Sequence, residues 1–341
     1  DKANFPRDKV CGDALSGKVM RVLDRIAPDV VDRLRGDTRQ LPSWGVTFTA
    51  PGGRSLRVPF SRNTGSGPAP GAIMPRLDFD ALLFERVRNT PGIDVFERTA
   101  VNSFEPSADG WRVGGDAGRL TIDARLVIAA DGANSYFARH VANLELDPRH
   151  HCAGVRAYFK GVLGLDAQGF IELIFLKELL PGYLWIFPLP DGRANVGLGL
   201  RSDVVRERRA DLKGMLGSLV ADHPALKERF RDAVMEGGIQ GLGLPLASKR
   251  RRLSGDGYLL VGDAVHRQDL GAVHDGRVEP GLDALVQEHR VQHHARGRAE
   301  AERHVADAQR RAHLRVATLE LADGLYGLQP VAARLLLAGR D

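Results

Sequence analysis

Cysteine is scarce in this sequence, with only Cys11 and Cys152 among 341 residues. Two thiols are too few for a disulfide framework, which excludes the small disulfide-rich secreted class and fits a reducing compartment. No apolar run approaches the about 18 residues that a membrane-spanning helix needs, and no signal peptide is visible. We therefore expect a cytoplasmic protein whose contact with a membrane, if it has one, is peripheral.

Internal repeats, low-complexity segments and long basic runs are also lacking. The net charge is +5, but without a basic run nothing indicates a nucleic-acid partner. Hydrophobic residues make up 43% and charged residues 27% of the chain, which is typical of a globular protein. The length suits one large domain or two ordinary ones, and the oligomeric state stays open.

A G-x-G-x-x-G turn, which cradles the pyrophosphate of a dinucleotide at a helix N-terminus, is missing as well. The nearest pattern is the Gly-Ser-Gly at 65–67. It is followed by Pro68 and Pro70, which prevent a helix from starting there. The sequence therefore offers no phosphate-binding turn of this kind.

What the sequence does contain is a pair of apolar runs that each end in aspartate and glycine. Residues 258–261 predict a strand buried on both faces, which ends in Gly262-Asp263. Residues 126–130 predict a second buried strand, which ends in Asp131-Gly132. Open α/β sheets bind ligands at the carboxyl ends of their strands, so the repetition predicts a ligand site. The alternative is two ordinary turns.

Elsewhere the spacing of apolar residues predicts both helices and strands. Helical spacing predicts helices over 16–26 and 76–88, the second with acidic residues in its first turn. Alternation predicts a hairpin over 46–60 and short strands at 93–96 and 99–104. Residues 151–200 are rich in predicted strands, so we expect a second sheet there.

Three aromatic residues alternate along one of these strands. The period of two places Tyr183, Trp185 and Phe187 on one face. Such a face forms either a wall of the core or the lining of an apolar pocket, and composition alone favours the core wall.

Cys11 lies in a loop close to Arg7 and Lys9. Nearby cations favour the thiolate, which makes Cys11 a candidate reactive residue. The alternative, and the commoner role of a single cysteine, is that of a small buried hydrophobic side chain.

Five stretches together resemble the geranylgeranyl reductase family of FAD-dependent oxidoreductases, within the p-hydroxybenzoate hydroxylase-like flavoprotein group. Their order and spacing fit over residues 1 to about 264. The stretches are Phe5–Asp13, Arg76 with Phe79-Asp80, Ala129–Ser135, the Tyr183-x-Trp185-x-Phe187-Pro188 run with Gly197-x-Gly199, and Leu260–Ala264.

The resemblance implies an α/β fold in which a Rossmann-like FAD-binding domain is interleaved with a mixed β-sheet substrate domain. The expected FAD-binding domain comprises 1–43, 75–150 and 252–300, and the substrate domain 44–74 and 151–251. Residues 301–341 form a C-terminal tail that we expect to be helical. The family carries its pyrophosphate turn upstream of the acid matched by Asp1, so the chain is expected to begin after that turn, with an incomplete FAD domain.

The resemblance also implies roles for individual residues. Cys11 is the candidate catalytic residue, beside the isoalloxazine and the substrate. Tyr183, Trp185 and Phe187 would line a tunnel for a long isoprenoid, which reverses the preference for a core wall. The residues expected to bind FAD are Asp1, Gly12, Arg76, Asp131, Gly132, Gly262 and Asp263.

The implied activity is reduction of isoprenoid double bonds, with FAD carrying the hydride chemistry. NAD(P)H or a ferredoxin would donate the electrons. Two alternatives stay open: a flavin-dependent monooxygenase or halogenase, and an inactive fragment that lacks the pyrophosphate turn.

The sequence departs from the family after Ala264, because no Pro- and Gly-rich turn follows directly. Seven of the 11 histidines fall in this tail. His289 and His293 are four residues apart, but no further ligand completes a metal site, so we expect none. Either a solvated charged helix or translation from a shifted reading frame would explain the composition.

Overall fold

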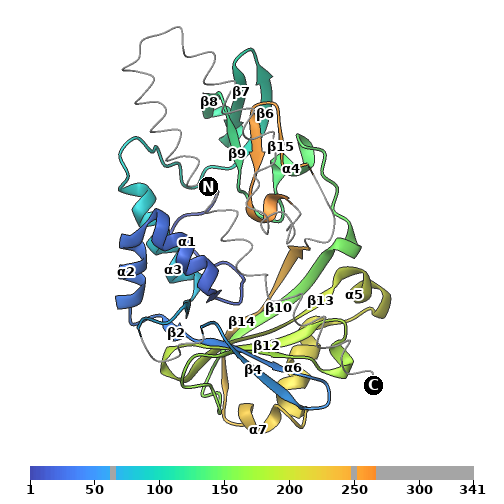
Figure 1. Ribbon diagram of the computed structural model, residues 1–341. Helices are drawn as coiled ribbons and strands as arrows, with labels where there is room; N and C mark the ends of the chain where they lie inside the picture. The colour runs from blue at the N-terminus through green and yellow to red at the C-terminus, as the bar shows by residue number, and fades with distance from the viewer. Residues whose placement is uncertain (62–66, 247–251, 266–341) are drawn as a thin grey trace.

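The computed structural model describes residues 1–61, 67–246 and 252–265 (Figure 1). The predicted FAD-domain segment 266–300, the tail 301–341 and the pair His289 and His293 lie outside the described residues. Figure 1 shows a large sheet at the bottom, a layer of helices beside it, and two small sheets at the top.

The large sheet has seven strands, in the order β14-β10-β13-β12-β11-β3-β4. Neighbours are antiparallel except β11 and β3, which run parallel. The strands are β3 (Gly45–Thr49), β4 (Ser55–Pro59), β10 (His151–Lys160), β11 (Ile171–Ile174), β12 (Tyr183–Pro188), β13 (Arg193–Arg201) and β14 (Val234–Pro245). The predicted hairpin at 46–60 and the second sheet within 151–200 are therefore confirmed.

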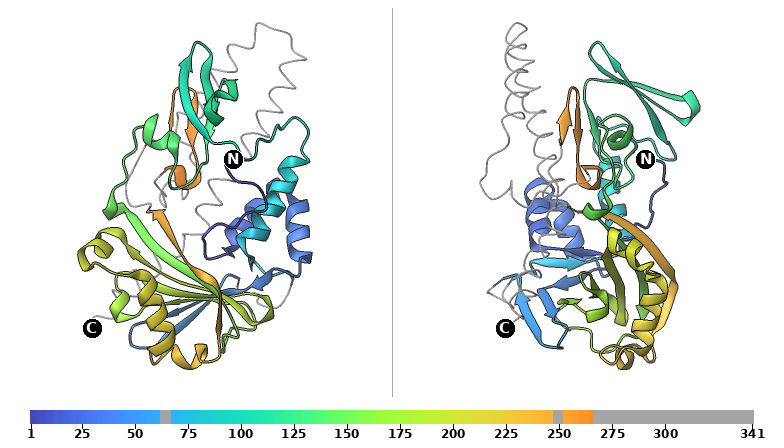
Figure 2. Two further views of the ribbon diagram at one scale, coloured as in Figure 1. Left: turned by 180° about the vertical axis from the view of Figure 1, so that it is seen from behind. Right: turned by 90° about the vertical axis from the view of Figure 1, so that its right-hand side faces the viewer.

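Both faces of the centre of this sheet are covered, which explains why β12 is apolar at nearly every position. On one face Leu184 and Ile186 are fully buried, in a cluster that includes Leu216 and Phe230. The helices on that side are α5 (Ser202–Arg208), α6 (Leu212–Asp222) and α7 (Lys227–Phe230) (Figure 2).

The helical layer consists of α1 (Gly17–Ile26), α2 (Pro28–Gly36) and α3 (Arg76–Arg88). Ser16 caps α1 by accepting a hydrogen bond from the amide of Val19, and Pro28 occupies the first position of α2. The apolar faces of these helices pack over a small sheet of β1 (Ala14–Leu15), β5 (Gly71–Ile73) and β2 (Leu41–Ser43). The helices predicted at 16–26 and 76–88 are thus confirmed.

Two more three-stranded sheets lie at the top of Figure 1. One contains β6 (Val101–Ser107), β7 (Gly110–Gly115) and β8 (Leu120–Ala124), and the other β15 (Ser254–Gly255), β16 (Tyr258–Leu260) and β9 (Val127–Ala129). Trp111 and Phe137 form their shared core with α4 (Tyr136–His140). The single-turn 3-10 helices are η1 (Asp116–Gly118), η2 (Pro148–His150), η3 (Lys177–Leu179), η4 (Pro190–Gly192) and η5 (Gly262–Val265).

Two predictions of secondary structure are wrong. Residues 93–96 form no strand, and Ile93 and Phe96 are half exposed. The run at 126–130 yields the short strand β9, but it is not buried on both faces, because Leu126 and Ile128 are 38% and 45% exposed. In the part of the chain that the structure describes, β9 is an edge strand, so an apolar run there does not mean full burial.

The domain boundaries predicted from the sequence remain a prediction. Strand β5, within the predicted substrate segment 44–74, pairs with β1 and β2 below the helical layer. Among the described residues, no helix is both long and apolar enough to cross a membrane.

Candidate functional site

The two turns that combine aspartate and glycine lie at the same sheet edge. Strands β9 and β16 run parallel, with Ala129 opposite Leu260, so Asp131-Gly132 and Gly262-Asp263 follow adjacent carboxyl ends. Both glycines have a positive φ, +82° at Gly132 and +59° at Gly262, which glycine adopts without strain. Among the residues that the structure describes, a Cβ atom at either position would meet nothing within 4 Å of it. The described residues therefore leave open space at this edge, where a ligand can approach the backbone of the two turns.

The two carboxylates at this edge have different partners. Asp131 accepts a hydrogen bond of 2.8 Å from the amide of Tyr136, at the first position of α4. Asp263 lies 3.3 Å from the ammonium nitrogen of Lys9, and its side chain is 16% exposed. Asp131 thus stabilises the turn itself, whereas Asp263 is held by a residue from the other end of the chain.

A single segment, the Arg7–Asp13 loop, links this edge to the helical layer and to the large sheet. Lys9 reaches Asp263 on η5, as described above. Asp8 pairs with Arg156 on β10, which is only 2% exposed. Arg7 donates a 3.1 Å hydrogen bond to Asp80 on α3. The loop therefore contacts three parts of the molecule that are far apart in sequence.

Arg76 begins α3 and lies beside Cys11. Its guanidinium donates hydrogen bonds of 2.6 and 3.0 Å to the two carboxylate oxygens of Asp80. Burial lowers the pKa of Arg76, but the Cys11 sulfur and the Asp80 carboxylate next to it raise that pKa above its usual value. The structure thus places a permanent cation next to the candidate catalytic thiol.

Asp1 joins the same chain of ion pairs at its outer end. Its carboxylate lies 3.8 Å from Arg7 and accepts a 2.8 Å hydrogen bond from the amide of Ala3. Its carbonyl oxygen accepts a 2.9 Å hydrogen bond from the amide of Thr99. Asp1 is 40% exposed, so the pair with Arg7 is weak, and its predicted contact with the adenosine ribose stays a prediction.

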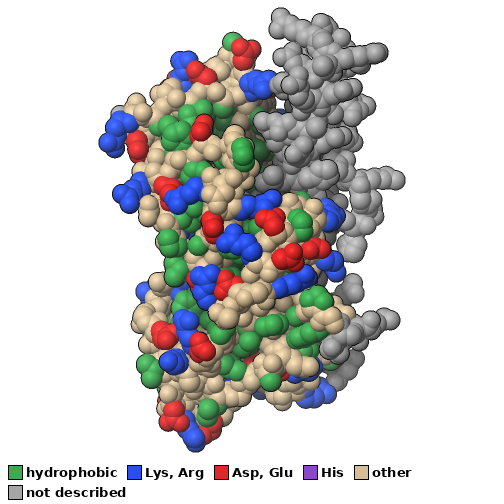
Figure 3. Space-filling view, turned by 90° about the vertical axis from the view of Figure 1, so that its left-hand side faces the viewer, with side chains coloured by type: hydrophobic (Ala, Val, Ile, Leu, Met, Phe, Trp, Pro, Cys, Tyr) green, Lys and Arg blue, Asp and Glu red, His purple; other side chains and the backbone are tan. Residues whose placement is uncertain are grey.

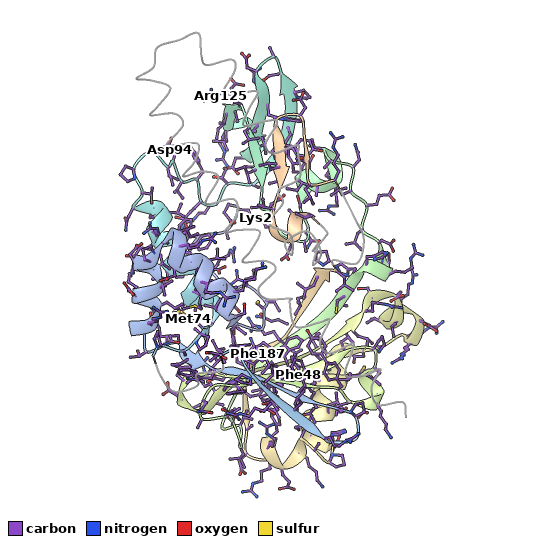
Figure 4. The ribbon with its side chains drawn as sticks, in the orientation of Figure 1. Lys2, Phe48, Met74, Asp94, Arg125 and Phe187 are labelled. Carbon is purple, nitrogen blue, oxygen red and sulfur yellow. The ribbon has the colours of Figure 1, made fainter. Side chains whose placement is uncertain are left out.

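The three aromatic residues of β12 share one face of the large sheet, as predicted. The ring centroid of Trp185 lies 6.2 Å from that of Tyr183 and 6.3 Å from that of Phe187. Trp185 and Phe187 are below 10% exposed and belong to a cluster that includes Phe48. Figure 4 shows Phe48 and Phe187 close together at the large sheet. These side chains are core in the described chain, and their role as a substrate lining stays a prediction.

Gly12 is where the Arg7–Asp13 loop meets this aromatic face. A Cβ atom at Gly12 would lie 2.6 Å from the ring carbon Cε2 of Phe187. No larger residue fits unless the ring moves, so the Cys11-Gly12 backbone lies directly on the aromatic face. The structure brings Cys11, Gly12, Arg76 and Phe187 together, and Lys9 connects them to Asp263.

Four polar residues at the end of the loop and beneath it were not predicted as site residues from the sequence: Asp13, Arg156, Tyr158 and Asn195. Asp13 is 1% exposed and has a φ of +69°. Its carboxylate accepts hydrogen bonds from the Tyr158 hydroxyl (2.8 Å), the Asn195 amide group (2.7 Å) and the Arg76 backbone (3.2 Å). Burial raises the pKa of Asp13 to about 6, although these hydrogen bonds and the charge of Arg156 act in the opposite direction.

A sequence signal for these residues does exist. Arg156 lies between Val155 and Ala157, and Asn195 between Ala194 and Val196. A polar residue inside an otherwise apolar strand needs buried hydrogen-bond partners. The pattern indicates a buried polar group, but it does not indicate what the partner is.

The described surface on the helical side carries charges of both signs. Figure 3 shows basic and acidic side chains interspersed over this face of the molecule. Ion pairs on the helices of this side include Arg33 with Glu85 at 2.6 Å and Arg39 with Asp78 at 2.7 Å.

The two thiols are expected to react differently with a thiol reagent. Burial raises the pKa of Cys152 to about 12, and its thiol donates a hydrogen bond to the carbonyl of Leu200. Both cysteines are partly exposed, so the expected difference rests on the raised pKa and the hydrogen bond of Cys152 and on the cations next to Cys11. We expect one equivalent of thiol to react in the native protein at pH 7.5, and two in the unfolded protein. Peptide mapping that finds the native label on Cys152 would contradict this assignment.

No family model matches the chain. It is 32% identical over 226 residues to digeranylgeranylglycerophospholipid reductase 2 of Methanopyrus kandleri, covering 64% of this chain and 52% of that protein. It is 27% identical over 277 residues to menaquinone reductase of Mycolicibacterium smegmatis, covering 77% and 63%.

Solved structures show the same fold. A geranylgeranyl bacteriochlorophyll reductase-like protein from Thermoplasma acidophilum superposes with a TM-score of 0.62 at 22% identity, covering 78% of this chain and 64% of that one. A flavin-dependent halogenase superposes with a TM-score of 0.62 at 23% identity, covering 78% and 48%. The fold is therefore that of FAD-binding flavoproteins, as predicted.

The chain spans about half the length of the curated reductases it matches first. Over that span the similarity in sequence is to reductases of geranylgeranyl lipids, and the similarity in fold is to FAD-dependent flavoenzymes. The chain is thus similar in sequence to geranylgeranyl lipid reductases and shares the fold of FAD-binding flavoproteins, which confirms the resemblance that its motifs indicated.

Proposed function

We propose that this chain belongs to an FAD-dependent reductase that saturates double bonds of an isoprenoid lipid. The observation that carries the proposal is the Arg7–Asp13 loop, which joins the edge with the two aspartate and glycine turns to the aromatic face of the large sheet. A flavin reductase for an apolar chain needs both surfaces within reach of each other. The names of the relatives, which are reductases of geranylgeranyl lipids and of menaquinone, point to the same substrate class.

The residues at the sheet edge fit FAD. Gly132 and Gly262 leave open space beside their turns, and the Asp263 carboxylate is the acceptor that a ribityl hydroxyl requires. Asp131 and Gly132 would support the same region through carboxylate and backbone. In this proposal Arg76 lies near the dinucleotide and Asp1 near the adenosine ribose. When bound, FAD supplies the hydride chemistry, with NAD(P)H or a ferredoxin as the source of electrons.

The residues on the other side of the loop fit an apolar substrate. Tyr183, Trp185 and Phe187 would exclude water from an isoprenoid chain and orient it along the sheet. Cys11 and Gly12 would lie between this wall and the flavin. The predicted division into an FAD-binding domain and a substrate domain forms part of the same proposal.

The decisive experiment is an anaerobic assay with a geranylgeranyl lipid, FAD and a chemical reductant such as dithionite. We expect the lipid mass to rise by about two daltons for each double bond reduced. A reaction that requires oxygen, or that inserts oxygen or halogen, would favour the monooxygenase or halogenase alternative. Protein that takes up no FAD would contradict the proposal for this chain.

Asp263→Asn is expected to weaken FAD binding about ten-fold or more, because a hydrogen bond to a charged carboxylate stabilises a complex by about 1.5–3 kcal/mol. The matched control is Asp256→Asn, which removes the same charge from an exposed position at the other end of β16. Titration monitored by flavin fluorescence measures both. Equal affinities for the two variants would show that Asp263 does not contact the cofactor.

A further inference from the structure

The Cys11-Gly12 peptide is held on the aromatic face by one buried amide side chain. Asn195 lies on β13, directly opposite Phe187 on one side and Tyr158 on the other. It is fully buried. Its Nδ2 group donates hydrogen bonds of 2.7 Å to the carbonyl oxygen of Cys11 and of 2.7 Å to the Asp13 carboxylate. Its Oδ1 atom accepts a hydrogen bond of 2.9 Å from the indole nitrogen of Trp185.

The chemistry of the partners permits only one orientation of this amide. The Trp185 indole can only donate, so the atom of Asn195 that faces it is the oxygen. The Cys11 carbonyl can only accept, so the atom that faces it is the nitrogen. Both N–H groups and the carbonyl oxygen of Asn195 are therefore engaged, and no other residue type offers this combination of donors and acceptor at that length.

Asp13 provides a second anchor for the same loop. The Asp13 carboxylate accepts hydrogen bonds from Asn195 on β13 and Tyr158 on β10, and also from the backbone of Arg76. Helix α3 has Pro75 at its N-cap and no capping bond from that side chain, so Asp13 accepts from an amide that lacks an intrahelical partner. The loop is thus tied to two strands and to the helix that carries Arg76.

We propose that Asn195 is a positioning residue, which sets the place of the Cys11 thiol relative to Trp185 and Phe187 by holding the Cys11 carbonyl and the Asp13 carboxylate. Asn195 acts through the loop and does not itself touch the reacting atoms. The proposal rests on the proposed function only in that the aromatic face receives the substrate. The hold on the loop can be measured without cofactor or substrate, so its failure is distinct from failure of the proposed function.

The test measures how fast Cys11 reacts with 4,4′-dithiodipyridine in a Cys152→Ser background, which leaves a single thiol. The substitution Asn195→Ala removes two hydrogen bonds to the loop, so we expect it to raise the second-order rate constant for the reaction of Cys11 about ten-fold. The matched control is Ser43→Ala, which removes the buried 2.7 Å hydrogen bond to the Gly169 carbonyl and leaves the loop untouched. We expect its rate to equal that of the parent.

A second variant, Asn195→Asp, distinguishes positioning from general destabilisation. Its new carboxylate would face the Asp13 carboxylate at hydrogen-bond distance, with Tyr158, Arg156 and the Arg76 backbone as the other neighbours. Two such carboxyl groups share a proton at low pH but repel each other when both are ionised. One shared proton can restore only one of the two hydrogen bonds that the Asn195 amide makes to the loop. We therefore expect a rate between those of the parent and Asn195→Ala at pH 5, and a rate near that of Asn195→Ala at pH 8, after normalisation to the unfolded protein.

Three results would overturn the proposal. The first is a rate for folded Asn195→Ala within two-fold of the parent. The second is an equal rise in Ser43→Ala, which would show that any loss of stability exposes the thiol. The third is an Asn195→Asp rate with the same pH dependence as the parent, and this measurement decides the question even if Asn195→Ala does not fold. Circular dichroism verifies folding in each case.

Discussion

Replacing Gly197 by alanine is expected to lower the free energy of unfolding by about 3 kcal/mol, the upper part of the range for overpacking a core. A Cβ atom at Gly197 would lie 2.2 Å from the Trp185 ring and 2.3 Å from the backbone oxygen of Val155. The ring could move, but the oxygen belongs to the neighbouring strand β10, so the sheet itself would have to shift. Urea denaturation followed by circular dichroism measures the effect.

Gly217→Ala on α6 is the matched control for this prediction. Within the described part of the chain, a Cβ atom there would meet nothing within 4 Å, apart from the backbone of its own helix. Alanine is the better helix former by up to about 1 kcal/mol, so this variant is expected to be as stable as the parent or more stable. If the free energy of unfolding of Gly197→Ala is within about 0.5 kcal/mol of the parent's, the indole does not lie over Gly197 as described.

The spacing of the Tyr-x-Trp-x-Phe-Pro and Gly-x-Gly stretches has a physical explanation in this contact. Trp185 on β12 is paired with Gly197 on β13, and Tyr183 with Gly199. On the β13 side, the glycine opposite Trp185 leaves the space in which the indole ring lies, whereas on the other side Trp185 stands opposite Leu173 of β11. The two stretches thus form one packing unit, whatever the aromatic face binds.

The second large effect is a pH dependence caused by Asp13. Its pKa is about 6 in the folded protein against a usual value of 3.8. Between these values the folded state binds more protons than the unfolded state. The stabilisation is therefore fully present below about pH 4 and is lost as the pH rises through about 6. A shift of this size corresponds to about 3 kcal/mol.

Asp13→Asn isolates this contribution, since asparagine does not titrate. The variant loses the hydrogen bond to one of the neighbouring donors, which gives an offset that is independent of pH. We expect the parent to lose stability relative to Asp13→Asn as the pH rises from 4 to 7. Other carboxylates, among them Asp37 and Asp203, have lowered pKa values and act in the opposite direction, but they are common to both proteins. A pH-independent difference in unfolding free energy between the two proteins would contradict the prediction.

Local patterns in the sequence were sufficient for much of the fold. Apolar periodicity placed the helices at 16–26 and 76–88 and the aromatic face of β12. Two apolar runs that each end in aspartate and glycine predicted a ligand site at the ends of strands. The structure adds that both turns share one sheet edge, because the two strands are parallel neighbours. The error at β9 arose because hydrophobicity does not distinguish an inner strand from an edge strand.

Only the tertiary structure decided how the site is held together. Lys9 and Asp263 are 254 residues apart, and Asn195 is 184 residues from Cys11. No local pattern encodes such pairs, because a polar side chain in an apolar strand shows that a partner is needed but not which residue provides it. The motifs of the sequence by themselves indicated the class of protein. Its apolar patterns indicated the strand ends and the aromatic face of β12 that form the candidate site. The fold alone decided that the Arg7–Asp13 loop joins them, since that depends on how distant strands pack.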